Sequence, residues 1–343
     1  MKFGVDRETV AGVETLSLTD RDSGAVCRML PELGATMWRL SLAADNPGGA
    51  AEGAAAGADP GAAEVLAPDA PEEIAQNPWF RGRILFPFND RIPDGRYRFD
   101  DREYRLTVND PDSTSALHGL VYDRPFAVTE VAADDARAAV TLLRELSPGD
   151  APGYPFGMRL GMRVTLAADG FTLELTAHNV GDRVAPVALG WHPYIALPDG
   201  VDAAHLTCPA ERSVAVDTDL MPTGDRPRVA GGPLDFTEPR PLTGRELDIA
   251  LERAPGIRAA GDGGLGAVGA ATTVVDRGVD RIIIEQSTDP FGFTQLFIPP
   301  ARDSIAVEPV TAATDAFNRP ELGLRRLEPG AALRGTVRIR RSV

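Results

Sequence analysis

The stretch FGMRLGMRVTLAADGFTLELTA, residues 156–177, contains two runs of alternating apolar residues on either side of a short turn. Successive side chains of a β-strand point to opposite faces, so each run predicts a strand with one buried face. The intervening Ala168-Asp169-Gly170 is a tight-turn sequence, and the two strands are predicted to pair as an antiparallel hairpin. His178 continues the polar face, which places it on the surface of the predicted sheet.

Strand-like runs continue on both sides of this hairpin. Turn sequences such as Pro93-Asp94-Gly95 separate them. Aromatic residues on both sides of Asp100-Asp101-Arg102 indicate a second hairpin, although its turn lacks the usual glycine. We therefore predict an all-β protein whose length is sufficient to bury a large core. The predicted strands cover residues 25–30, 36–42, 184–189, 281–286, 293–299, 305–308 and 333–339.

Residues 44–73 differ from the rest because they are mostly Ala, Gly, Pro and acidic residues. Such a segment buries too little apolar surface to offset its ordering entropy. We predict a solvent-exposed surface loop, which a short Gly/Ser linker could replace with little change in stability or activity. Residues 254–271 are rich in Gly and Ala and predict another loop.

The overall charge and the cysteine content exclude several classes of protein. A formal net charge of −15 disfavours nucleic acid or an anionic membrane surface as partner. Cys27 and Cys208 form neither a disulfide framework nor a Cys-x-x-Cys metal motif. The first residues lack the apolar core of a signal peptide, and no apolar run approaches the roughly 18 residues of a membrane span. These features predict a cytoplasmic protein with no membrane segment.

Sequence motifs for bound groups are also missing. The chain has no glycine-rich phosphate loop, no Gly-x-Ser-x-Gly and no His/Cys spacing typical of a metal site. We therefore predict activity without a metal ion or a nucleotide cofactor.

A histidine follows the predicted strand 184–189, in Leu189-Gly-Trp-His-Pro-Tyr194. Histidine exchanges a proton near neutral pH, so His192 is a candidate acid or base. The flat faces of Trp191 and Tyr194 are suited to stacking on a sugar ring. The alternative is a core histidine that a backbone group satisfies.

Two more candidates belong to short polar segments. Arg91 precedes the predicted turn 93–95, and its alternative is a surface arginine paired with a neighbouring aspartate. His118 lies in Leu-His-Gly, where Gly119 permits a positive φ or a close approach of another backbone.

Two carboxylates complete the candidate set. Apolar residues flank Asp248, which indicates burial with a partner; the alternative is the N-cap of a short helical turn at 249–253. Glu308 ends a buried-looking strand just before Pro309, as a general base could. Its alternative is a strand-end glutamate in a salt bridge.

Together these segments resemble the aldose 1-epimerase (galactose mutarotase) family, in order and over nearly the whole chain. One departure is Asp90, which stands between the asparagine and the arginine of the family's Asn-Arg-Ile motif. The matching motifs are Asn-Asp-Arg-Ile at 89–92, Leu-His-Gly at 117–119, Gly-Trp-His-Pro-Tyr at 190–194, Leu-Asp at 247–248, Ala-Val-Glu-Pro at 306–309 and Thr-Asp-Ala-Phe-Asn at 314–318.

The resemblance implies one domain over residues 1–343, a large antiparallel β-sandwich of the galactose mutarotase-like type. It implies a monosaccharide bound in a cleft on the concave sheet, no metal and no cofactor, in a monomer or homodimer. Family roles carried over make Glu308 the base and His192 the acid that open the sugar ring. His118, Arg91 and Asp248 would then orient the sugar hydroxyls and stabilise the open form.

Three alternative functions remain open. A sugar sensor could keep the cleft without turnover, although the presence of both Glu308 and His192 argues against it. A polysaccharide lyase is disfavoured by the aromatic content of 6% and by the missing signal peptide. A hexose-phosphate mutarotase would need a cluster of arginines at the rim of the cleft.

Overall fold

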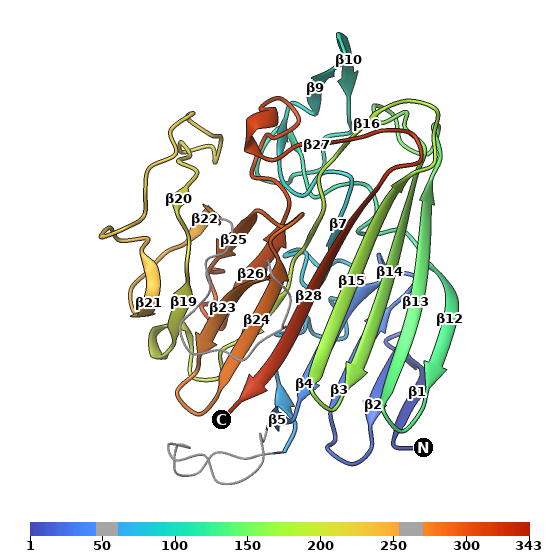
Figure 1. Ribbon diagram of the computed structural model, residues 1–343, viewed down its shortest axis with the longest axis vertical. Coiled ribbons are helices and arrows are strands. Elements are labelled where there is room, and N and C mark those ends of the chain that lie inside the picture. The colour runs from blue at the N-terminus through green and yellow to red at the C-terminus, as the bar shows by residue number, and fades with distance from the viewer. Residues whose placement is uncertain (46–60, 254–269) are drawn as a thin grey trace.

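The computed structural model describes residues 1–45, 61–253 and 270–343. In these ranges the only helices are two short 3-10 turns, Val201–Ala203 and Pro320–Leu322, and all other regular structure is strand (Figure 1). None of the described helices is long and apolar enough to cross a membrane. The prediction of an all-β fold is confirmed.

A ten-stranded sheet extends across the molecule (Figure 1). Its strand order is β12-β13-β14-β15-β28-β24-β23-β19-β21, and β5 pairs in parallel with β28. The hairpin at its centre is the predicted one, with Leu166 opposite Phe171. The strands are β5 (Ala44–Asp45), β12 (Ala127–Ala133), β13 (Arg137–Leu146), β14 (Met158–Ala167), β15 (Gly170–Asn179), β19 (His205–Cys208), β21 (Phe236–Pro241), β23 (Ala270–Asp276), β24 (Arg281–Ser287) and β28 (Ala332–Ser342).

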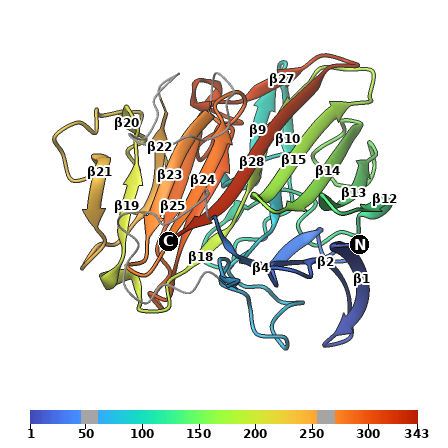
Figure 2. The same cartoon turned by 60° about the horizontal axis from the view of Figure 1, so that its bottom comes forward.

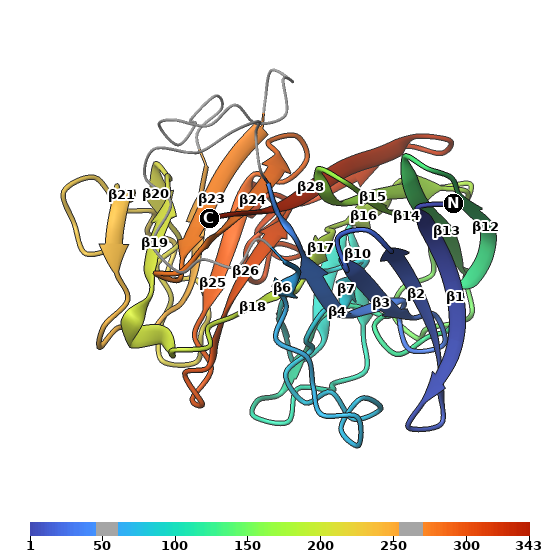
Figure 3. The ribbon, with the colours of Figure 1, turned by 90° about the horizontal axis from the view of Figure 1, so that it is seen from below.

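Two further sheets pack on the large one. The five-stranded sheet, in the order β1-β2-β3-β4-β6, lies against β12–β15, as Figures 2 and 3 show. Its strands are β1 (Phe3–Val10), β2 (Val13–Asp20), β3 (Val26–Leu30), β4 (Thr36–Leu42) and β6 (Ala63–Glu64). The seven-stranded sheet contains β7 (Ile84–Leu85), β17 (Gly190–Trp191), β18 (Tyr194–Ala196), β20 (Arg212–Ser213), β22 (Asp248–Glu252), β25 (Phe293–Phe297) and β26 (Ser304–Val310). One continuous apolar core joins the layers, as in a β-sandwich.

Three two-stranded pairs lie outside these sheets. The β9–β10 pair is the predicted aromatic hairpin. At its turn Asp100 and Asp101 have φ of 48° and 60°. Asp tolerates the left-handed region better than most residues, which explains how the turn forms without glycine. The pairs are β8 (Ile92–Pro93) with β11 (Ser115–Ala116), β9 (Arg96–Phe99) with β10 (Arg102–Arg105), and β16 (Ala185–Val187) with β27 (Arg325–Leu327).

The prediction of a replaceable surface loop at 44–73 is wrong for its C-terminal part. Ala63–Glu64 forms β6 and pairs with β4. Val65 and Leu66 are fully buried in the core. Composition alone missed this because backbone pairing and two apolar side chains suffice to anchor a segment that is otherwise small and polar. Residues 46–60 lie outside the described residues, as do 254–269 of the second predicted loop.

We expect Leu66→Ala to destabilise the protein by about 2–5 kcal/mol, because truncating a buried leucine removes apolar contacts and leaves a cavity. Chemical denaturation with equal m-values for both proteins would measure this difference. Ala70→Gly, at a half-buried position in the same segment, is the matched control. A loss below about 1 kcal/mol for Leu66→Ala would show that the segment contributes little to the core.

Candidate active site

Three adjacent strands of the seven-stranded sheet present polar side chains on one face. Glu308 on β26 is the register partner of Gln295 on β25. Asp248 on β22 is paired with Phe297, two residues further along β25. Because side chains alternate, all four point to the same face. Gln295 Nε2 donates a hydrogen bond of 2.7 Å to Asp248 Oδ1. Asp248 is also the first residue of β22, which excludes the alternative that it caps a helical turn.

His192 lies between β17 and β18, opposite this row of side chains. Its N–H donates to the Arg83 carbonyl at 3.0 Å, and its carbonyl accepts from Gly82 N–H at 2.8 Å. Its ring stacks on Tyr194, with ring centroids 5.0 Å apart and planes at 1°. Backbone bonds and stacking together hold the imidazole in one orientation.

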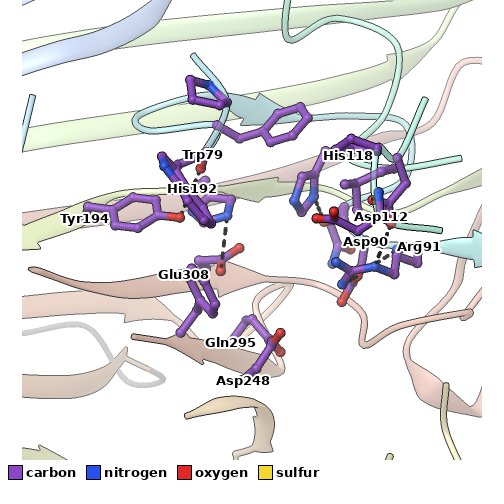
Figure 4. A pocket seen from close by; sticks show the side chains of 17 residues that line it. Trp79, Asp90, Arg91, Asp112, His118, His192, Tyr194, Asp248, Gln295 and Glu308 are labelled. Carbon is purple, nitrogen blue, oxygen red and sulfur yellow. Dashed lines mark hydrogen bonds and ion pairs between the residues drawn. The ribbon is translucent and has the colours of Figure 1, made fainter. Parts of the chain in front are cut away.

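His192 and Glu308 face each other at the bottom of a pocket (Figure 4). The His192 Nε2 to Glu308 Oε1 distance is 3.5 Å, and the two residues are 5% and 2% exposed. The other ring nitrogen, Nδ1, is buried and has no hydrogen-bond partner among the described residues. Nε2 is therefore the ring nitrogen that faces the Glu308 carboxyl group.

The pocket shifts the two pKa values in opposite directions. Burial, followed by the charges of Asp90 and Asp248, raises the pKa of Glu308 well above 4.5. Burial, followed by His118 and Arg81, lowers the pKa of His192 well below 6.5. The pocket thus opposes the charged form of each group, as expected for a buried carboxyl and a buried imidazole.

His118 occupies a strained position at the pocket wall. Its φ is 61°, and Gly119 has φ of 88°. A Cβ on Gly119 would meet the Phe86 carbonyl oxygen at 2.2 Å, so glycine is required both for conformation and for close approach. His118 Nδ1 donates to the Asn89 carbonyl at 3.0 Å. Burial lowers the pKa of His118 to about 4, which leaves Nε2 as a neutral acceptor.

Arg91 is oriented by acidic neighbours and by the segment that follows β26. Its Nε donates to Asp110 Oδ2 at 2.9 Å. Its backbone carbonyl accepts from Asp315 N–H at 3.0 Å. Thr314 Oγ1 donates to Asp90 Oδ2 at 2.5 Å. The Thr-Asp-Ala-Phe-Asn motif therefore clamps the Asn-Asp-Arg motif in place, although the two are more than two hundred residues apart in sequence.

The prediction that Trp191 stacks on a sugar is wrong. Trp191 is 0% exposed and packs on Phe171 in the core, with ring centroids 5.7 Å apart. Its indole N–H donates to the Gly82 carbonyl at 3.2 Å. A ring enclosed by protein has no face left for a ligand.

The structure brings the other five predicted residues, Arg91, His118, His192, Asp248 and Glu308, together in one pocket. Sequence reasoning missed several of the residues beside them. Gln295 could have been predicted if β25 had been paired with β26, because side chains that are register partners point to the same face of a sheet. Trp79 belongs to an irregular segment with no periodic signal. The further lining residues include Trp79, Phe80, Asp110, Asp112, Gln295 and Phe297.

The layered antiparallel sheets define a β-sandwich protein of the galactose mutarotase-like class. A galactose mutarotase-like protein from Clostridium acetobutylicum superposes with a TM-score of 0.79 over 99% of both chains, at 14% identity. The family model of aldose 1-epimerase matches residues 56–340. The chain belongs to the aldose 1-epimerase family.

Curated relatives match over part of their length. The uncharacterized protein YihR of Escherichia coli (strain K12) is 31% identical over 192 residues, 55% of this chain and 59% of that protein. The galactose mutarotase of Homo sapiens is 27% identical over 185 residues, 52% of this chain and 51% of that protein. The chain thus spans between half and three fifths of the length of these relatives.

Proposed function

We propose that this protein is an aldose 1-epimerase that interconverts the α and β anomers of a monosaccharide without metal or cofactor. The observation that carries the proposal is the buried Glu308–His192 pair, at 3.5 Å on the floor of a polar pocket. Membership of the family supports the same reaction class. We also propose that the protein acts in the cytoplasm, as the sequence predicts.

Ring opening needs one proton removed and one proton added at the same edge of the sugar. Glu308 takes the proton of the anomeric hydroxyl, and the O1–C1 bond becomes a carbonyl. His192 gives a proton to the ring oxygen as the C1–O5 bond breaks. The aldehyde carbon rotates, and the two groups reverse their roles to close the ring on its other face. Glu308 and His192 together hold the same number of protons before ring opening and after ring closure, so the reaction needs no cofactor.

The buried environment favours this first proton movement. Ring opening converts a carboxylate and an imidazolium into their neutral forms, which burial stabilises. Ring closure regenerates the charged forms, whose mutual attraction at 3.5 Å offsets part of the desolvation cost. The pKa shifts therefore favour the neutral pair, and the carboxylate and imidazolium that begin ring opening form against the desolvation cost.

The surrounding polar groups suit the hydroxyls of a sugar. His118 Nε2 and the carboxyl of Asp248 accept hydrogen bonds, and the guanidinium of Arg91 donates them. Burial and the charge of Asp90 raise the pKa of Asp248 to about 6. These three residues can orient the ring and hold the oxygens of the open form.

The charge of the pocket favours a neutral sugar over a hexose phosphate. One arginine, Arg91, lines the described pocket, whereas the lining carboxyl groups belong to Asp90, Asp110, Asp112, Asp248 and Glu308. A phosphate group is recognised by clustered cations and is repelled by carboxylates.

The test is exchange NMR between α and β anomers over a panel of free and phosphorylated aldoses. We expect acceleration above the spontaneous rate for at least one free sugar. Sugar binding without any acceleration would instead indicate a sensor, and faster exchange of a hexose phosphate would contradict the preference for a neutral sugar.

His118 should remain neutral, with hydrogen on Nδ1, at pH 6. Burial lowers its pKa to about 4, so the ring gains its second proton only when the pH falls to that range. Nitrogen-15 NMR of the ring nitrogens, with His118→Asn to identify the signals, measures both the charge and the tautomer. A doubly protonated ring at pH 6 would contradict the assignment of Nε2 as the acceptor for a sugar hydroxyl.

Treatment with a chelator should leave anomer exchange unchanged. Across the three described ranges no group of three or more His, Cys, Asp or Glu could hold a metal ion, and proton transfer in the proposed reaction requires none. Activity is measured after dialysis against EDTA, with the same sample after metal addition as control. Loss with EDTA and recovery with one metal would refute cofactor-free catalysis.

A further inference from the structure

Arg81 contacts the aromatic ring on which His192 stacks. Its guanidinium carbon lies over the Tyr194 ring, 4.5 Å from the ring centroid. The Tyr194 ring in turn lies parallel to the imidazole of His192, with centroids 5.0 Å apart (Figure 4). Arg81 itself is not among the described residues that line the pocket. It therefore reaches the reacting groups through Tyr194 and not through the sugar.

Three oxygen atoms hold the guanidinium of Arg81. Its Nε lies 3.4 Å from Oδ1 of Asp69, whose side chain is 5% exposed. Its Nη1 donates to Ser304 Oγ at 3.1 Å, and its Nη2 lies 3.6 Å from Asp303 Oδ1. Ser304 is the first residue of β26, the strand that carries Glu308. Arg81 therefore links the strand of the proposed base to the ring that supports the proposed acid.

The backbone beside Arg81 also holds His192. The Gly82 N–H donates to the His192 carbonyl at 2.8 Å, and the Arg83 carbonyl accepts from the His192 N–H at 3.0 Å. The buried side chain of Asn77 donates to the Arg81 carbonyl at 3.0 Å and accepts from the Arg81 N–H at 2.7 Å. The segment 81–83 thus supports His192 twice, through its backbone and through the Arg81 side chain.

We infer that Arg81 is a positioning residue for the proposed acid, because its guanidinium fixes the Tyr194 ring and thereby the imidazole of His192 that faces Glu308. The effect on turnover rests on the proposed function, whereas the stacking itself does not. A planar guanidinium can lie on an aromatic ring while its N–H groups bind oxygen atoms at its edge. The ammonium of lysine keeps the charge but not this geometry.

The kinetic test measures kcat and KM for anomer exchange. Arg81→Gln should lower kcat by about 10–10²-fold, because a misplacement of about 1 Å can cost up to about 10²-fold. KM should stay nearly unchanged, since Arg81 does not line the pocket. Arg81→Lys, which keeps the charge, should recover part of the loss. A wild-type kcat for Arg81→Gln, or a loss confined to KM, would overturn the inference.

The matched control is Arg326→Gln. Arg326 lies over the Phe99 ring at the same distance of 4.5 Å, and it has a carboxylate partner in Asp100 at 2.9 Å. It does not belong to the described pocket lining. Arg326→Gln should leave kcat unchanged, and a loss equal to that of Arg81→Gln would overturn the inference.

A double-mutant cycle tests whether the effect of Arg81 passes through Tyr194. Tyr194→Leu removes the aromatic ring and keeps an apolar side chain. In this background Arg81→Gln should cost little further kcat, because two residues that act through one contact are not additive. Additive losses would overturn the inference, since Arg81 would then act by another route.

Proton NMR of the imidazole separates this inference from the proposed function, because it requires no turnover. The ring current of Tyr194 displaces the signals of the His192 ring protons, which His192→Asn identifies. Arg81→Gln should move these signals toward their positions in Tyr194→Leu, and Arg326→Gln should not. Unchanged signals in a folded Arg81→Gln protein would overturn the inference even if the enzyme is active. Displaced signals without turnover of any sugar would refute the epimerase and keep the positioning role.

Discussion

Glu308→Gln should lose anomer exchange by about 10²–10⁴-fold, the range typical of removing a general acid or base. Glutamine keeps the shape and the hydrogen-bonding oxygen of the side chain, but it cannot take the proton of the anomeric hydroxyl. Because Glu308 is buried and its pKa is raised, a neutral side chain should not lower stability. Sugar binding should therefore survive while turnover collapses.

The measurement is the exchange rate of the purified variant, with its melting temperature and its affinity for the sugar. Glu174→Gln is the matched control because Glu174 is an exposed glutamate on β15, outside the pocket lining. If Glu308→Gln retains more than roughly a tenth of the wild-type rate, on the scale set by that range, Glu308 is not the base.

His192→Asn should reduce exchange by a similar factor of about 10²–10⁴. Asparagine keeps a polar group at this position, but its amide is too weak an acid to protonate the ring oxygen. The substitution also removes the stacking of the imidazole on Tyr194, so a moderate loss of stability is expected. Measuring the rate well below the melting temperature separates the chemical effect from this structural one.

His178→Asn is the matched control for His192→Asn. His178 is half-buried on β15 and contacts the Gly330 carbonyl at 3.1 Å through Nε2, outside the pocket lining. A folded His192→Asn protein with near wild-type exchange would exclude His192 as the acid. Equal losses in both variants would point to a general effect of histidine removal.

Local signals predicted the strands with a clear alternating or apolar run, such as β14, β15 and β24, whereas β12 and β13 were not predicted. The alternation at 156–177 is strong because the period of two depends on each strand alone. The aromatic hairpin was predicted correctly for the same reason, although its Asp-Asp turn lacks glycine. β6 was missed because a strand of two residues has no period and forms only through the backbone of β4.

The candidate residues were predicted from the chemistry of their side chains and from the family resemblance. Their arrangement in space could not be predicted in this way. His192 and Glu308 are suited to proton transfer as residue types, and the family motifs selected them from the other histidines and glutamates. Only the pairing of β22, β25 and β26 brings Asp248, Gln295 and Glu308 to one face. Only the fold places His192 at 3.5 Å from Glu308.

The sequence by itself determined the β class, the central hairpin of β14 and β15 and the residue types available for acid–base chemistry. The tertiary structure alone decided which tryptophan is exposed beside the pocket. Trp191 lies on a two-residue strand, and Trp79 lies on an irregular turn, so neither has a local pattern that gives its direction. Long-range packing turns the first into the core against Phe171 and the second outward at the mouth of the pocket.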